Sequence, residues 1–367
     1  MLLAPDCFGG TLSALAAAQV LAEGWRAVRP ADELDLLPLS DGGPGFVEVL
    51  RAALPGAQVV TTRVEDPLAR TVEASLLLHL GTAYVESAQA CGLHLLSEAE
   101  RDPATTTTYG VGQLVRAALD AGARRVVVGL GGSATNDGGA GLLAALGVAG
   151  YDAQGEAVAP GGLALARVAR LVGSPPPGLD LVAATDVDAP LLGPIGASAV
   201  FGPQKGADAA LVERLDAALG QWADVLESEL GVSVRELPGA GAAGGLGAAL
   251  LALGAVREPG IALVAELLGL ADRVGRADLV VTGEGRFDWS SLRGKVVSGV
   301  AAAAAQQAVP CLVVAGQVAV GRREAAALGV EASYSLAEAV GLDRALAEPS
   351  SALAELAGRV AGQWSPL

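Results

Sequence analysis

The sequence contains few of the residues that carry common types of catalysis. Among 367 residues there are 2 histidines, 3 cysteines and 1 methionine, and only 3% of the residues are aromatic. Cys7, Cys91 and Cys311 are far apart and form no CxxC pair, which argues against a disulfide framework or a zinc site. His79 and His94 lie beside leucines, where a structural role is expected. Acid–base chemistry must therefore come from carboxylates or lysines.

Basic segments and long apolar runs are also missing. The formal net charge is −16 and no basic block interrupts it, so a nucleic-acid partner is not expected. A long uncharged stretch, residues 239–256, is mostly glycine and alanine and is a poor candidate for a membrane span. The N-terminus lacks the positive and apolar regions of a signal peptide. We expect a cytoplasmic protein without a membrane partner.

Short apolar runs instead alternate with alanine- and leucine-rich stretches. The runs end in Gly, Asp or Ser, and the clearest of them are residues 2–5, 124–130, 181–185, 279–282 and 309–315. This rhythm of strand, loop and helix predicts an α/β fold, and the length predicts about two domains. Ligands of such folds bind at the carboxyl ends of the strands, which is where we look for chemistry.

Only two lysines occur among the 24 basic residues, and both lie beside glycines. Lys205 stands in Gln204-Lys205-Gly206 and Lys295 follows Gly294. A flexible ammonium next to residues that allow close backbone approach suits a phosphate. The alternative is that both are remnants of a drift toward arginine.

Two glycine-rich loops differ in their value as signals. Residues 129–141 carry six glycines, including Gly131 and Gly132, with Ser133, Asn136 and Asp137 before an expected helix. Backbone N–H groups of such a loop suit an anion, although a plain tight connection is the alternative. Residues 239–244 fit GxGxxG but follow Leu237-Pro238 rather than a strand, so they are weak support for a dinucleotide site.

Six carboxylates follow strand-like runs or lie in glycine-rich turns, namely Asp6, Asp41, Asp137, Asp186, Asp188 and Glu284. Oxygen ligands at such places suit Mg²⁺, although Asp in loops also caps helices and turns. The sequence has neither the GxxxxGK[ST] loop nor the protein-kinase signatures, so phosphoryl transfer would use neither standard design.

Several segments, in this order, resemble the signatures of the bacterial type I glycerate kinases: residues 4–8 (APDCF), 39–43 (LSDGG), 105–110 (TTTTYG), 131–141 (GGSATNDGGAG), 185–191 (TDVDAPL), 201–207 (FGPQKGA), 238–245 (PGAGAAGG) and 282–288 (TGEGRFD). The resemblance implies ATP- and Mg²⁺-dependent phosphorylation of glycerate, most often on the 2-hydroxyl. It also implies two α/β domains. We place a discontinuous, Rossmann-like parallel-sheet domain at residues 1–65 and 286–367, and an inserted α/β domain at residues 66–285.

We hypothesise roles for these residues on that basis. Asp186 accepts the substrate hydroxyl proton, while Lys205 and Lys295 neutralise charge on the transferred phosphoryl group. Asp188 or Glu284 holds Mg²⁺. The nucleotide contacts are assigned to Gly131, Gly132, Gly283, Glu284 and Gly285, and the glycerate contacts to Ser133, Asn136, Asp137 and Arg286.

Departures from the family pattern keep other functions open. Cys7 and Gly9 replace the serine and lysine of the usual Pro-Asp-Ser-Phe-Lys, and Pro44 replaces a glutamate after Asp41-Gly42-Gly43. These changes allow a kinase for another small hydroxy acid, or an impaired metabolite-binding homologue. A 3-phosphoglycerate product and a homo-oligomer also stay open.

Overall fold

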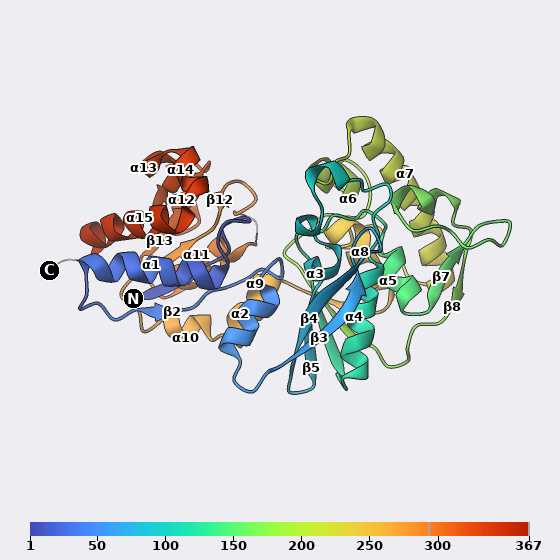
Figure 1. Ribbon diagram of the computed structural model, residues 1–367, viewed down its shortest axis with the longest axis horizontal. Helices are drawn as coiled ribbons and strands as arrows, with labels where there is room; N and C mark the ends of the chain where they lie inside the picture. Colours follow the sequence, from blue (N-terminus) through green and yellow to red (C-terminus); the bar gives the residue numbers. More distant parts are fainter. Residues whose placement is uncertain (293, 366–367) are drawn as a thin grey trace. The chain divides into compact units, whose positions relative to one another are not determined.

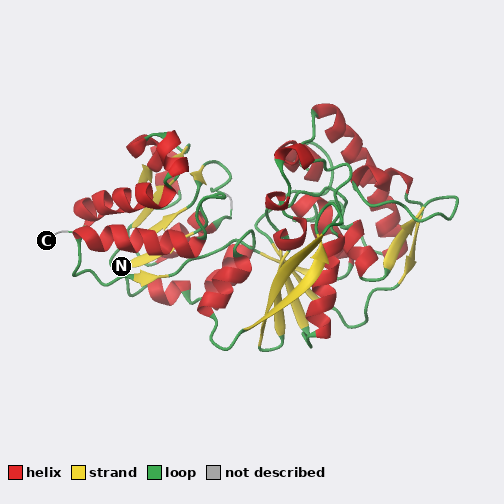
Figure 2. Cartoon of the chain, in the orientation of Figure 1, coloured by secondary structure: helices red, strands yellow, loops and turns green. Residues whose placement is uncertain are grey.

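The computed structural model describes residues 1–292 and 294–365, which form two compact units. One comprises Met1–Asp41, Glu48–Ala53 and Pro259–Leu367, and the other comprises Gly42–Val47 and Leu54–Glu258. Figures 1 and 2 show that both combine helices with strands, as the alternating pattern of the sequence predicted. None of the described helices is both long and apolar enough to cross a membrane.

The first unit is built on a five-stranded parallel sheet. Its strand order is β15 (Val330–Ser335), β13 (Cys311–Ala315), β11 (Val280–Gly283), β1 (Leu2–Pro5) and β2 (Asp35–Leu36). A short parallel pair, β12 (Arg286–Phe287) and β14 (Gln317–Val318), lies beyond the ends of β11 and β13. The central strands are buried on both faces, which explains why they are continuous apolar runs in the sequence.

Helices cover both faces of this sheet. Leu3, Val281 and Leu312 join residues of α1 (Ala14–Val28) and α15 (Pro349–Trp364) in one buried cluster. The alternate residues, such as Val280, point the other way, and α11 (Val296–Gln306) contacts the same strands. The other helices of this unit are α9 (Gly260–Leu267), α10 (Leu270–Val274), α12 (Arg322–Ala327), α13 (Leu336–Val340) and α14 (Leu342–Ala347).

The chain returns to the first unit at Pro259, earlier than the residue 286 expected from the sequence. The reason is strand β11, which pairs in parallel with β1 through Leu2↔Val280 and Ala4↔Thr282. Gly283, Glu284 and Gly285 therefore belong to the first unit rather than to the inserted one.

The second unit has a six-stranded mixed sheet. Its order is β10 (Val256–Glu258), β9 (Asp180–Ala184), β6 (Arg125–Gly129), β5 (Thr82–Glu86), β4 (Thr71–His79) and β3 (Gln58–Glu65). The β3–β4 and β4–β5 pairs are antiparallel, and the other pairs are parallel. A separate antiparallel pair is formed by β7 (Val148–Tyr151) and β8 (Arg170–Gly173). The four parallel strands end at one edge of the sheet, and the loops with the expected site residues begin there.

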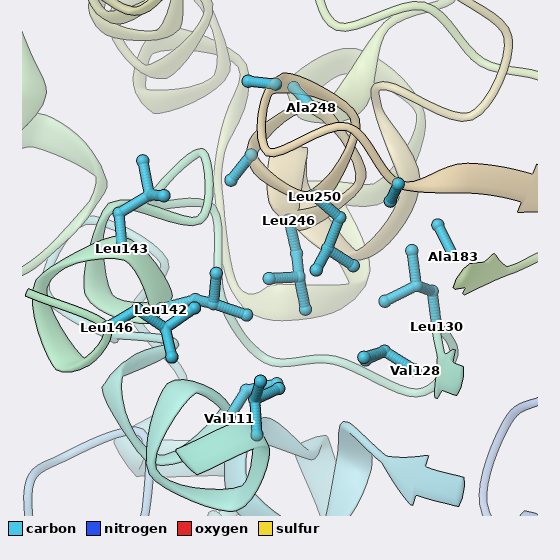
Figure 3. Close-up of a cluster of buried hydrophobic side chains, with 14 of the residues drawn as sticks. Val111, Val128, Leu130, Leu142, Leu143, Leu146, Ala183, Leu246, Ala248 and Leu250 are labelled. Atoms are coloured by element: carbon cyan, nitrogen blue, oxygen red, sulfur yellow. The ribbon is translucent and has the colours of Figure 1, made fainter. Parts of the chain in front are cut away.

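A large apolar core fills the second unit between sheet and helices. Figure 3 shows Val128 and Ala183 of the sheet beside Leu142 and Leu246 of two helices. The helices of this unit are α3 (Ala88–Cys91), α4 (Tyr109–Asp120), α5 (Ala140–Ala145), α6 (Ala197–Phe201), α7 (Ala209–Leu230) and α8 (Ala242–Ala252), with short 3₁₀ turns at Leu93–Leu95, Glu98–Glu100, Gly162–Arg167 and Pro203–Lys205. Helix α2 (Phe46–Ala53) is divided between the two units.

Candidate active site

The glycine-rich loop and Asp186 leave neighbouring strands at the same edge of the second sheet. Strands β6 and β9 run parallel, and Gly129 is the register partner of Ala184. Gly131 and Asp186 each lie two residues beyond that pair. The register therefore brings together a carboxylate and a glycine-rich loop.

Glycine is required in this loop because a second motif packs against it. A Cβ on Gly131 would lie 2.6 Å from Gly43 Cα, and one on Gly132 would lie 2.7 Å from Pro44 Cγ. Gly132 also has a left-handed φ of +65°. No acceptor among the described residues takes the backbone N–H groups of Gly131, Gly132 and Ser133. Successive free N–H groups around a left-handed glycine form a concave donor surface that suits an anion.

Lys205 contacts this loop from inside the protein. Its side chain is 1% exposed, and Nζ donates hydrogen bonds to Ser133 Oγ at 2.9 Å and to the Thr135 carbonyl at 2.7 Å. Burial lowers the pKa of Lys205 to about 8, although the charge of Asp137 opposes the decrease. Lys205 therefore contacts the loop from its buried side, through Ser133 and Thr135.

Asn136 and Asp137 are buried within the same unit. Asn136 Nδ2 donates to Ser198 Oγ at 3.0 Å, while its Oδ1 has no partner among the described residues. The Asp137 carboxylate accepts from Thr107 Oγ1, from the N–H and Oγ1 of Thr108, and from the N–H groups of Gly139 and Gly141, at 2.8–3.3 Å. Burial raises the pKa of Asp137, and these donors oppose the rise.

The geometry favours a structural role for Asp137 over the substrate contact expected from the sequence. Both carboxylate oxygens of Asp137 accept hydrogen bonds from protein donors, and Asp137 is only 1% exposed. It connects the loop before α5 to Thr107 and Thr108, at the start of α4. Sequence reasoning assigned no role to these threonines beyond the resemblance of residues 105–110 to the family signature. The Thr108 side chain makes no helix-cap hydrogen bond, and both hydroxyls donate to Asp137 instead.

Asp137→Asn is expected to lower the free energy of unfolding by about 2–4 kcal/mol, because an amide NH₂ would face N–H and O–H donors in a buried site. Urea denaturation measures this loss. In the folded variant, KM for the substrate should stay within about threefold of the wild-type value. A large rise in KM at unchanged stability would instead return Asp137 to the substrate site.

Asp186 and Asp188 differ in their surroundings. Asp186 is partly buried at the end of β9, where Thr185 Oγ1 accepts from the Val187 N–H and shapes the turn. Asp188 is exposed, and its Oδ1 accepts from Arg257 at 2.6 Å. An aspartate already paired with a guanidinium has less capacity to hold a cation, so this contact weakens the magnesium role expected of Asp188.

Glu284 follows β11 in the first unit and is 6% exposed. Its Oε1 has no hydrogen-bond partner among the described residues. Burial, together with the charges of Asp288 and Asp41, raises the pKa of Glu284 to about 7, against the opposing effects of Ser291 and Lys295. Burial and the charges of Asp41 and Glu284 likewise raise the pKa of Asp6. These carboxylates repel one another, and a divalent cation would relieve the repulsion.

Glu284 therefore fits one of the roles expected of it, that of a magnesium ligand. The described residues contain no group of three or more His, Cys, Asp or Glu side chains arranged for a metal. Mg²⁺ commonly takes only one or two carboxylates, and water and substrate phosphates supply the rest. Glu284 offers one carboxylate oxygen that has no hydrogen-bond partner among the residues described.

The other expected residues of the first unit surround Glu284 in sequence. A Cβ on Gly283 would lie 2.1 Å from the Val314 carbonyl oxygen, and one on Gly285 would lie 2.9 Å from the Gly9 nitrogen, so both glycines are required for packing. Arg286 is exposed and pairs with Asp288 at 3.4 Å. Lys295 Nζ donates to Ser290 Oγ at 2.9 Å, directly before α11.

The structure thus groups the expected residues by unit. Gly283, Glu284, Gly285, Arg286 and Lys295 belong to the first unit, and Gly131, Gly132, Ser133, Asn136, Asp137, Asp186, Asp188 and Lys205 to the second. In the second unit, hydrogen bonds join Ser133 to Lys205, and strand register places Asp186 at the same edge. These features define a two-unit α/β protein with an anion-binding type of loop beside a carboxylate.

Comparison with known proteins agrees with this description. The sequence model that describes the glycerate kinase family matches residues 1–365 of this chain. Glycerate kinase of Halalkalibacterium halodurans is 42% identical over 98% of this chain and 97% of its own length. Glycerate 2-kinase of Escherichia coli K12 is 41% identical over 94% of this chain and 92% of its own length.

A crystal structure from Salmonella typhimurium LT2, assigned as glycerate kinase 2, superposes with a TM-score of 0.79 at 40% identity, covering 99% of this chain and 97% of that one. The chain belongs to the glycerate kinase family. It is accordingly an enzyme, a phosphotransferase with an alcohol group as acceptor.

Proposed function

We propose that the enzyme transfers the γ-phosphoryl group of ATP to D-glycerate, with Mg²⁺, and forms 2-phosphoglycerate. The relatives named glycerate kinase and glycerate 2-kinase support the substrate. The observation that carries the proposal is the shared sheet edge, where the free N–H groups of Gly131–Ser133 and the Asp186 carboxylate follow paired strands. A phosphoryl transfer needs donors for anionic oxygens and a base for the hydroxyl, and this edge offers both.

The residues divide these tasks in the proposal. Asp186 accepts the proton of the attacking hydroxyl, and the N–H groups of Gly131 and Gly132 bind an anionic oxygen. Lys295, half-buried before α11, supplies positive charge for the phosphates, and Arg286 is the cation for the glycerate carboxylate. Mg²⁺, when bound, neutralises phosphate charge. Glu284 is the preferred protein ligand, with Asp188 as the alternative.

A second candidate is phosphorylation of a different small hydroxy acid. Gly9 stands where the family pattern has a lysine. Its backbone has a φ of +39°, and nothing lies within 4 Å of the position that a Cβ would take. A cation that would restrict the substrate is therefore missing at this position. A broader acceptor range would follow from its absence.

Coupled ADP release tests the proposal, with D-glycerate, L-glycerate, lactate and tartrate as acceptors. We expect D-glycerate to give the highest kcat/KM, and ³¹P and ¹H NMR of the product to show phosphate on the 2-hydroxyl. A higher kcat/KM for another acid favours the second candidate. Binding of ATP and acid without ADP release would instead indicate a metabolite-binding homologue, and Gly9→Lys would then test the missing lysine.

The role of Glu284 predicts a pH-dependent requirement for Mg²⁺. The pKa of Glu284 is raised to about 7, so the carboxylate is ionised only above that pH, and protons compete with the cation below it. The Mg²⁺ concentration for half-maximal rate should rise about fivefold from pH 7 to pH 6. Glu284→Gln should weaken Mg²⁺ activation and remove this dependence. If Asp188→Asn does so instead, the metal role passes to Asp188.

A further inference from the structure

The ammonium group of Lys205 is buried and forms no ion pair with a described carboxylate. Its Nζ reaches only neutral oxygens, Ser133 Oγ and the Thr135 carbonyl, and the described residues offer it no carboxylate within salt-bridge distance. Unpaired buried charges are costly, and proteins retain them chiefly at functional sites. An anion brought by a ligand to the outer side of the loop would compensate this charge.

Hydrogen-bond chemistry fixes the direction of the Ser133 hydroxyl. An ammonium has donors only, so Ser133 Oγ must accept in the 2.9 Å bond with Lys205. The Ser133 proton then points away from the lysine, and no described acceptor takes it. The N–H groups of Gly131, Gly132 and Ser133 are also free of acceptors among the described residues. One loop thus holds four unused donors, and one of them is polarised by a buried charge.

We propose that Lys205 is a positioning residue that acts through Ser133, orienting and polarising its hydroxyl to donate to an anionic oxygen of a bound substrate. This inference rests on the proposed function, because it presumes substrates that carry carboxylate or phosphate groups. It also revises the direct phosphoryl contact first expected of Lys205, which its burial behind Ser133 prevents. The oxyanion belongs either to the hydroxy acid or to the nucleotide, and separate KM values distinguish the two.

Charge on Lys205 is needed for this action, so it should be lost at alkaline pH. The ionisable groups that act on Lys205 are Cys91 of α3 and Asp137 before α5, and burial outweighs both. The pKa of Lys205 is lowered to about 8, and the lysine is charged only below that pH. We therefore expect kcat/KM to fall as pH rises through about 8.

A double-mutant cycle tests whether the two residues act as one. Ser133→Ala and Lys205→Met should each lower kcat/KM about 10- to 100-fold, the usual range for hydrogen bonds to charged groups. The rise in KM should appear for one substrate, glycerate or ATP. The double variant should be within about twofold of Ser133→Ala, because the lysine has no further effect once the hydroxyl is gone. Multiplied losses would overturn the proposal.

The pH profile provides a readout that a merely structural lysine would not affect. Ser133→Ala should remove the alkaline limb near pH 8 while leaving Lys205 in place. Thr106→Val is the matched control, because Thr106 Oγ1 is another buried hydroxyl that donates to the same loop, at 3.0 Å from the Ala134 carbonyl. It should lower stability and keep the limb. Retention of the limb in Ser133→Ala, or its loss in Thr106→Val, would contradict the proposal.

The test also separates this inference from the proposed function. If the wild-type enzyme turns over none of the acids, the proposed function fails, and the same variants are compared by calorimetric binding of glycerate and of ATP·Mg²⁺. The same non-additive losses are then expected in Kd. If Lys205→Met does not fold, the comparison of Ser133→Ala with Thr106→Val still decides the matter. Unchanged Kd values for both ligands in Ser133→Ala would overturn the inference.

Discussion

Asp186→Asn is expected to lower kcat at least about 100-fold, because general bases contribute roughly 10²–10⁴ to the rate. The substitution keeps the shape of the side chain and removes its capacity to take the hydroxyl proton. KM values for glycerate and ATP should change by less than about threefold, since the binding groups at the strand ends are retained. Steady-state kinetics with both substrates varied, at pH 7.5, measures these values.

Asp188→Asn is the matched control, because Asp188 lies in the same loop but is exposed and paired with Arg257. We expect this variant to retain most of kcat, with any deficit restored by excess Mg²⁺. A loss of tenfold or less in Asp186→Asn would remove Asp186 from the role of base. A larger loss in Asp188→Asn than in Asp186→Asn would transfer that role to Asp188.

The sequence predicted the strands that position the site because they are buried on both faces. Residues 2–5, 124–130, 181–185, 279–282 and 309–315 became β1, β6, β9, β11 and β13, with bounds within a few residues of those expected. Continuous apolar runs are unambiguous in a parallel sheet, and the loops after them carry polar residues for the same topological reason. The placement of Asp186 beside the Gly131 loop follows from this pattern.

Which polar groups are accessible could not be predicted from the sequence. Asp137 and Lys205 both lie in glycine-rich segments typical of ligand-binding loops, yet both are 1% exposed. Inside the protein, Asp137 accepts a hydrogen bond from Thr108, and Lys205 donates one to Ser133. Neither partner is adjacent in sequence to the residue that it binds. The return of the chain at Pro259 was missed for a similar reason. Strand order in a sheet is a long-range property, and β11 pairs with a strand 278 residues earlier in the chain.

The GxGxxG-like segment also gains a physical explanation, as a packing surface. Residues 239–244 directly follow a turn rather than a strand, and Ala243, Gly244 and Gly245 have left-handed backbone angles at the start of α8. A Cβ on Gly244 would lie 1.9 Å from the Thr135 carbonyl oxygen, and the Gly244 carbonyl accepts from the Gly138 N–H at 3.0 Å. These glycines bring the two loops into direct backbone contact.

Gly244→Ala is therefore expected to lower the free energy of unfolding by at least about 3 kcal/mol, measured by urea denaturation. The left-handed backbone alone costs roughly 1–2 kcal/mol for an L-residue. Ala243, with a φ of 51°, shows that an alanine can adopt this left-handed backbone here. The rest of the expected loss of stability comes from the clash of the new methyl group with the Thr135 carbonyl.

Gly254→Ala separates the two contributions, because Gly254 has a φ of +87° and nothing within 4 Å of the position that a Cβ would take. This control should lose only the backbone cost, about 1–2 kcal/mol. Equal losses in the two variants would show that Thr135 gives way freely. A larger loss in Gly244→Ala would show that Thr135 resists the added methyl group. In either case the carbonyl that Lys205 binds must shift in the folded variant, so kcat/KM should fall. The glycine would then act on the reaction through the same loop as Ser133.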